Sequence, residues 1–146
     1  MKQKMRVLLG SFGILLLLVS CNKEMVIDYT DPQAVVASQQ EIIGSIIAGE
    51  LTSKKGYKKL VNMCSQGYLK EYPKKQFMAL LHQYEQYQEV DMCMQQYEIQ
   101  DTVYQGDQDV EVFIKQHYNN GLTMERKITL VKEREQWRIQ GDKIIR

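Results

Sequence analysis

Residues 109–130 have the sequence DVEVFIKQHYNNGLTMERKITL, in which two alternating segments flank a turn. A period of two, with apolar side chains on one face, is typical of a half-buried strand. The apolar positions are Val110, Val112 and Ile114 before the turn, and Leu122, Met124, Ile128 and Leu130 after it. The turn itself, Asn119-Asn120-Gly121, is a strong hairpin signal because Asn and Gly tolerate positive φ. This stretch therefore predicts two antiparallel strands that bury the same face.

Further strands are predicted on both sides of this hairpin. Residues 92–103 also alternate, but the parity changes across Gln95-Gln96, which predicts a bulge in a long strand. Gly106-Asp107 then predicts a turn into the hairpin. After it, a polar turn at residues 133–136 leads to a last strand over residues 137–144. The C-terminal half is thus predicted to be a four-stranded antiparallel meander.

The N-terminal half has the helical period instead. Asp31-Pro32 is a typical helix start, an N-cap carboxylate followed by Pro at the first helical position. Apolar spacing of three and four residues predicts helices over residues 31–50, 53–67 and 73–88. Helices that precede a meander favour an α+β domain with the helices gathered on one face of the sheet.

Three segments resemble parts of the NTF2-like superfamily. Residues 51–65 (LTSKKGYKKLVNMCS) are similar to the second helix of its small exported members, and residues 71–77 (EYPKKQF) to the start of the third. Residues 135–139 (EQWRI) resemble the closing strand. The resemblance covers roughly residues 32–146. It implies a cone, close to cystatin-like folds, in which a curved sheet wraps the helices and leaves a pocket at the wide mouth. It implies no catalytic residues for this chain.

The first 21 residues have the features of an export signal. Lys2, Lys4 and Arg6 form a basic head, and residues 7–19 are apolar apart from Gly and Ser. This run is shorter than the roughly 20 residues that a membrane-spanning helix needs. The segment Leu18-Val19-Ser20-Cys21 that closes it resembles the lipobox of bacterial lipoprotein precursors.

The lipobox resemblance implies cleavage between Ser20 and Cys21 and acylation of Cys21. The expected organisation is a signal peptide over residues 1–20, a lipidated tether over 21–30 and an NTF2-like domain over 31–146. The alternatives are an ordinary secretory signal that contains a cysteine, or an uncleaved anchor. By this resemblance the protein works in the cell envelope, held in the lipid bilayer. Asn22 in place of Asp permits the outer membrane if the source is diderm.

Charge excludes one class of partner. Without residues 1–20 the chain has sixteen Lys and Arg against eighteen Asp and Glu, a formal charge of −2. Nucleic-acid binding requires a basic face, so we expect no nucleic-acid partner. Membrane attachment is expected to come from the acyl groups rather than from a polybasic segment.

Two cysteines remain after Cys21, namely Cys64 and Cys93. In an exported protein an even pair of this kind indicates a candidate disulfide. The alternative is two thiols that act as small apolar side chains.

Catalytic and metal-binding motifs are absent from the sequence. The histidines, His82 and His117, have no partner at a zinc-ligand spacing, so no metal and no cofactor are expected. Among the aspartates, Asp101 shares the parity of Ile99 and Val103 and is the candidate general base of a lyase or isomerase. The favoured interpretation assigns no catalytic residue.

Aromatic and methionine side chains could line a ligand pocket or simply fill the core. The candidate lining residues are Tyr57, Tyr84, Met92, Met94, Tyr97 and Trp137. Three hypotheses follow from the sequence. The first is a lipid-anchored, non-enzymatic domain that binds a small ligand or an envelope protein. The second is a small lyase or isomerase on the same scaffold, and the third is a structural or assembly lipoprotein.

Overall fold

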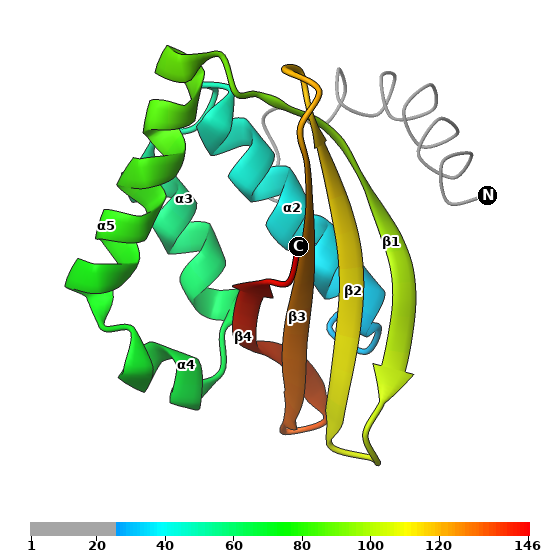
Figure 1. Cartoon of the computed structure of the whole chain (residues 1–146). Helices are drawn as coiled ribbons and strands as arrows, with labels where there is room; N and C mark the ends of the chain where they lie inside the picture. Colours follow the sequence, from blue (N-terminus) through cyan, green and yellow to red (C-terminus); the bar gives the residue numbers. More distant parts are fainter. Residues whose placement is uncertain (1–25) are drawn as a thin grey trace.

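The structure, a computed structural model that describes residues 26–146, consists of helices followed by a four-stranded sheet (Figure 1). The helical elements are α2 (Pro32–Ile47), α3 (Ser53–Leu60), the 3-10 segment η1 (Val61–Met63), α4 (Gln66–Glu71), α5 (Lys74–Glu85) and the 3-10 segment η2 (Gln86–Val90). The strands are β1 (Met94–Tyr104), β2 (Asp109–Tyr118), β3 (Thr123–Glu133) and β4 (Gln136–Ile144). This confirms the prediction of an α+β fold. The proposed signal peptide and Cys21 lie outside the described residues.

The sheet is an antiparallel meander of order β1-β2-β3-β4 that is not closed into a barrel. The predicted bulge at Gln95 is confirmed, because the β1–β2 register shifts between Met94 and Gln96. Two further irregularities were not predicted. One leaves Gln100 unpaired in β1, and the other leaves Gln140 unpaired in β4. Bulges bend a strand and increase its twist, which accounts for the curvature in Figure 1.

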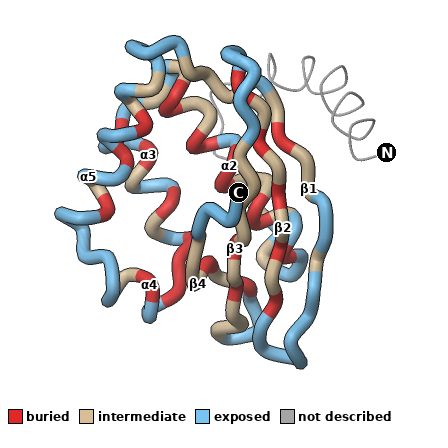
Figure 2. Tube along the Cα trace, in the orientation of Figure 1, coloured by how far each residue is buried: buried red, intermediate tan, exposed pale blue. Residues whose placement is uncertain are grey.

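The core lies between α2 and the inner face of the sheet (Figure 2). The buried side chains of α2 are mainly β-branched and follow the predicted helical spacing: Val35, Val36, Ile42, Ile43, Ile46 and Ile47. They face the alternating side chains of the strands, among them Val110, Val112, Ile114, Ile128 and Leu130. The helical period thus outweighs the strand propensity of the β-branched residues in α2.

The prediction of one helix over residues 53–67 is wrong. Thr52 caps α3, and the helix ends at Leu60. The chain then turns towards the sheet, where the amide of Ser65 donates a hydrogen bond of 2.8 Å to the carbonyl of Ile139. The Ser65 hydroxyl caps α4, in which Gly67 is helical rather than a stop signal. A tertiary hydrogen bond to β4 therefore interrupts the predicted helix.

Gly56 of α3 lies against the buried side chain of Ile46. A Cβ atom at this glycine would stand 2.5 Å from Ile46 Cδ1. The Gly56→Ala variant should lose about 1–2 kcal/mol of unfolding free energy, since overpacking outweighs the gain of about 1 kcal/mol in helix propensity. Gly67→Ala is a matched control, because its Cβ would meet the flexible end of Gln140. Urea denaturation measures both, and a stabilised Gly56→Ala would contradict this packing.

Glu85 connects the end of α5 to the start of α3. One of its oxygens accepts a hydrogen bond of 2.9 Å from the Ser53 amide, and the other lies 2.9 Å from His82 Nδ1. Hydrogen bonds from Ser53, followed by that from His82, lower the pKa of Glu85 from 4.5 to about 2. Since the folded-state pKa is the lower one, this stabilisation is present above pH 4.5 and is lost as the pH falls towards 2.

The expected effect is small because the Glu85 side chain is partly exposed. In Glu85→Gln, the fall of the urea midpoint between pH 4.5 and pH 2 should be shallower than in the wild type. Equal slopes for the two proteins would show that the Glu85 carboxylate does not link α5 to α3.

Candidate functional site

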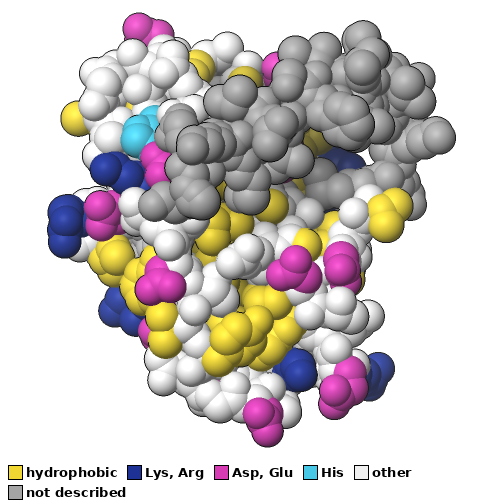
Figure 3. Space-filling view, turned by 90° about the vertical axis from the view of Figure 1, so that its right-hand side faces the viewer, with side chains coloured by type: hydrophobic (Ala, Val, Ile, Leu, Met, Phe, Trp, Pro, Cys, Tyr) yellow, Lys and Arg dark blue, Asp and Glu magenta, His cyan; other side chains and the backbone are white. Residues whose placement is uncertain are grey.

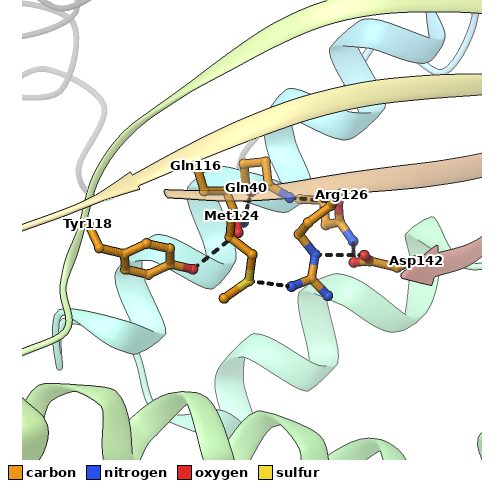
Figure 4. A network of polar contacts seen from close by, with 7 residues as sticks. Gln40, Gln116, Tyr118, Met124, Arg126 and Asp142 are labelled. Carbon is orange, nitrogen blue, oxygen red and sulfur yellow. Dashed lines mark hydrogen bonds and ion pairs between the residues drawn. The ribbon is translucent and has the colours of Figure 1, made fainter. Parts of the chain in front are cut away.

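A continuous chain of polar side chains crosses the inner face of the sheet (Figure 4). Helix α2 and strands β2, β3 and β4 each contribute to it. Its members are Gln39, Gln40, Gln116, Tyr118, Met124, Arg126 and Asp142.

The first part of this polar chain joins β2 to α2. The hydroxyl of Tyr118 donates to Gln116 Oε1 at 3.1 Å. Gln116 Nε2 donates to Gln40 Oε1 at 2.6 Å, and Gln40 Nε2 donates to Gln39 Oε1 at 3.0 Å. Gln40 and Gln116 are buried, with 0% and 2% exposure, so these amides replace hydrogen bonds that water would otherwise make.

The second part ends in an ion pair between β3 and β4. Gln39 Nε2 donates to Asp142 Oδ2 at 3.1 Å, and Arg126 Nε donates to Asp142 Oδ1 at 2.8 Å. The two charged side chains are only 11% and 10% exposed. Arg126 Nη1 also contacts Met124 Sδ at 3.4 Å. Two opposite charges are therefore paired in a nearly dry setting.

Strand geometry explains how Arg126 and Asp142 reach the same face. Arg126 has the parity of Ile128 and Leu130 along β3 and therefore points inward. Asp142 and Ile139 would have opposite parity in a regular strand, but the bulge at Gln140 moves Asp142 to the inner face, opposite Ile128. The one sequence signal for this network is that Gln116 and Arg126 occupy apolar positions of alternating strands.

The electrostatics of the network favour fixed protonation states at neutral pH. Burial raises the pKa of Tyr84 to about 12, against the opposing effect of Arg126. Burial likewise raises the pKa of Tyr118. Burial disfavours the charge of Arg126, but Asp142, together with Tyr84 and Tyr118, offsets this effect and raises the pKa of the guanidinium. The tyrosines are thus neutral and Arg126 is charged, an arrangement that suits a structural network rather than proton transfer.

The interior beside this network has little free volume. A cavity of about 20 Å³ lies between α2, α5 and β4, and Gln39, Tyr84 and Asp142 are among its lining residues. This volume suits about one water molecule. This cavity is far smaller than the pocket that the NTF2-like resemblance implied.

Two of the predicted pocket residues lie in separate aromatic contacts. Tyr57 packs edge-on against Phe77 with ring centroids 5.2 Å apart. Tyr84 packs against Tyr87 at 5.5 Å. Both contacts belong to the helical layer.

The other four candidate residues lie elsewhere. Trp137 is buried at the start of β4, where its ring centroid lies 6.1 Å from that of Tyr104. Met94 and Tyr97 line a groove of about 270 Å³ between α2 and β1, and Met92 packs partly buried on the core. The structure therefore does not bring the six predicted residues together in one pocket.

Asp101, the candidate general base of the lyase or isomerase hypothesis, does not face the interior. Its side chain is exposed, and its Oδ1 accepts a hydrogen bond of 2.8 Å from the Thr102 amide. The irregularity at Gln100 interrupts the alternation on which the inward placement was based. Because a general base needs an apolar pocket to raise its pKa, Asp101 lacks the setting for that role.

The histidines are at the surface or its boundary, as predicted. His117 Nε2 lies 2.8 Å from Glu98 Oε2 on the outer face of the sheet, and His82 Nδ1 lies 2.9 Å from Glu85. Within residues 26–146, no group of three or more His, Cys, Asp or Glu side chains could hold a metal ion.

Cys64 and Cys93 are free thiols in the structure, which does not join them as the candidate disulfide would. Cys64 forms a bridge with Ile139 of β4, whereas Cys93 directly precedes β1. The two cysteines therefore lie at opposite edges of the sheet, whereas a disulfide requires Cα atoms within about 7 Å.

We expect the native protein to show two thiols of unequal reactivity. Burial raises the pKa of Cys64 to about 12, and its Sγ contacts the Leu60 carbonyl, so alkylation at neutral pH should be slow. Cys93 is less buried and should react first. Thiol titration with and without reductant measures this. A protein that shows these two thiols only after reduction would contradict it.

A larger hollow lies outside the core, between α3 and the segment that precedes α2. It has a volume of about 400 Å³. Its apolar lining comes from Ile27, Tyr29 and Ile42. Its polar lining is Lys55, Lys58, Lys59 and Asn62. We call this hollow the lysine groove; its volume lies within the range of small-molecule sites.

Tyr29 fixes one wall of the lysine groove against β4. Its carbonyl accepts a hydrogen bond of 2.8 Å from the Trp137 amide, and the Arg138 guanidinium lies 4.0 Å from the centre of its ring. Ile27 and Tyr29 of the predicted tether therefore pack on the domain.

Comparisons with known proteins bear on the fold alone. No protein-family model matches the chain, and no curated protein does. The solution structure of a SEC-C motif containing protein from Rhodopseudomonas palustris resembles this structure with a TM-score of 0.54. The two chains share 10% identity over 82% of each. Such low identity shows a shared fold and no shared function.

Among residues 26–146, every helix is too short or too polar to cross a bilayer.

Proposed function

We propose that this protein is an exported lipoprotein, anchored through acylated Cys21, whose α+β domain is a non-catalytic binding module of the NTF2-like type. The anchor rests on the basic, apolar and lipobox segments of residues 1–21. The NTF2-like assignment is supported by the curved meander with its helices on the inner face. The binding role rests mainly on one observation, the lysine groove.

The lysine groove is a better candidate binding site than the buried network. In the network the charges and amides of Arg126, Asp142 and Gln40 are paired within the protein, and the adjoining cavity is about 20 Å³. The groove instead combines an apolar floor with exposed ammonium groups. Ligand sites commonly combine an apolar lining with a few well-placed polar groups.

Native mass spectrometry of the full-length protein, extracted in mild detergent from its own membrane, tests this function. We expect a covalent lipid mass together with a non-covalent ligand or partner that dissociates on activation. A protein that carries the lipid and releases nothing would contradict the binding role. A protein without the covalent lipid would contradict the anchor.

One observation favours assembly as a second candidate function. Strand β1 is an edge of the sheet and exposes Val103 and Tyr104 near its end. Hydrophobic side chains also gather in the middle of the face shown in Figure 3, with acidic side chains near them. Exposed edges and apolar patches are typical of surfaces that pair with another chain.

A further inference from the structure

We propose that the lysine groove binds the phosphate head group of an anionic membrane lipid, with the part of the acyl chain nearest the head group lying on the apolar floor. This inference rests on the proposed anchoring of the chain through Cys21. It adds an electrostatic contact to the membrane that would fix the orientation of the domain.

The helical period places the cations together. Lys58, Lys59 and Asn62 follow Lys55 by three, four and seven residues along α3 and η1, so the four side chains share one helical face. The opposite face of α3 is buried through Gly56 and Leu60. All three lysines are exposed, and none takes part in an ion pair among the described residues.

Charge complementarity selects the chemistry of the occupant. No carboxylate is among the described residues that line the groove, whereas three ammonium groups and one side-chain amide are. Ammonium groups bind phosphate as point charges. Ile27 and the ring of Tyr29 offer apolar surface beside them, over the nearly buried Ile42, so the arrangement fits a molecule with an anionic head and an apolar chain.

The length of the chain before the groove selects the source of this molecule. Five residues lie between Cys21 and Ile27, and the six Cα-to-Cα steps that join these two positions span at most about 20 Å when extended. An acylated Cys21 lies at the bilayer surface, so the groove cannot be far from lipid head groups. Each lysine near an anionic surface strengthens binding by roughly fivefold.

The test uses the full-length acylated protein reconstituted into two kinds of vesicle. One kind is phosphatidylcholine alone, and the other is an equimolar mixture with phosphatidylglycerol. Amine acylation followed by mass spectrometry reports each lysine separately. We expect labelling of Lys55, Lys58 and Lys59 to fall by about fivefold in the anionic vesicles. Lys115 and Lys143, which lie on the sheet, serve as internal controls.

Two triple variants that each remove three positive charges distinguish a specific site from general electrostatic attraction to the membrane. Amide hydrogen exchange of residues 26–30 should slow in anionic vesicles for the wild type. This slowing should disappear in the variant Lys55→Gln/Lys58→Gln/Lys59→Gln. It should persist in Lys70→Gln/Lys74→Gln/Lys75→Gln, which removes three lysines of α4 and α5.

Equal labelling in both kinds of vesicle would overturn the proposal, as would equal loss of slowing in both variants. If inorganic phosphate added to neutral vesicles protects the lysines as well as phosphatidylglycerol does, the lipid is not the ligand. A protein without acyl groups is recognised by its mass and fails to reconstitute, which contradicts the anchor rather than the groove.

Discussion

Replacing Arg126 with Met is expected to lower the free energy of unfolding by about 3–5 kcal/mol. The variant would leave the Asp142 carboxylate, which is 10% exposed, without its guanidinium partner. Gln39 would remain as a donor to Asp142, but one amide does not balance a buried charge. Urea denaturation at neutral pH, with a slope unchanged from the wild type, would measure this loss.

The double variant Arg126→Met/Asp142→Leu separates the cost of an unpaired charge from the net value of the pair. Apolar replacement of both partners in a buried ion pair is often close to neutral. We therefore expect the double variant to be more stable than Arg126→Met. The single variant Asp142→Leu completes the cycle. If Arg126→Met costs less than about 1 kcal/mol, or if the losses of Arg126→Met and Asp142→Leu simply add in the double variant, the pair is not coupled as the structure shows.

Replacing Cys21 with Ser is expected to abolish incorporation of a palmitate analogue completely. A thioether to diacylglycerol requires the Cys21 sulfur, and the lipobox resemblance places cleavage directly before this residue. Two or three acyl chains hold a protein far more firmly than one, because each buried methylene contributes about 0.8 kcal/mol. The loss of the anchor should therefore have a larger effect on location than any change in the folded domain.

The chain contains its own matched controls for this experiment. Cys64→Ser and Cys93→Ser remove the other two cysteines and should incorporate the analogue as the wild type does. Gel fluorescence after coupling of the incorporated analogue compares the four proteins directly. Incorporation that survives in Cys21→Ser, or that is lost in Cys93→Ser, would assign the lipid to another site.

The sheet could be predicted because its information is local. Alternation over residues 109–130 and the Asn-Asn-Gly turn encode the central hairpin within one continuous stretch. The Gln95 bulge was visible as a change of parity among apolar residues. The Gln140 bulge was not, because β4 has few apolar residues after Ile139 from which a change of parity could be recognised.

The candidate sites could not be predicted because they depend on contacts distant in sequence. The network joins Gln40 to Gln116 and Arg126 to Asp142 through the pairing of α2 with the sheet and through the Gln140 bulge. The lysine groove forms only when Tyr29 docks on β4 beside α3. Net charge also concealed it, since the value of −2 for the chain without residues 1–20 averages the lysines of α3 with acidic residues elsewhere.

The intact mass of the full-length protein, purified from the membranes of the cells that make it, tests the central claim most directly. The account predicts a chain that begins at Cys21 and carries the added mass of two or three acyl groups. A chain that retains residues 1–20, with an unmodified cysteine at position 21, would contradict it.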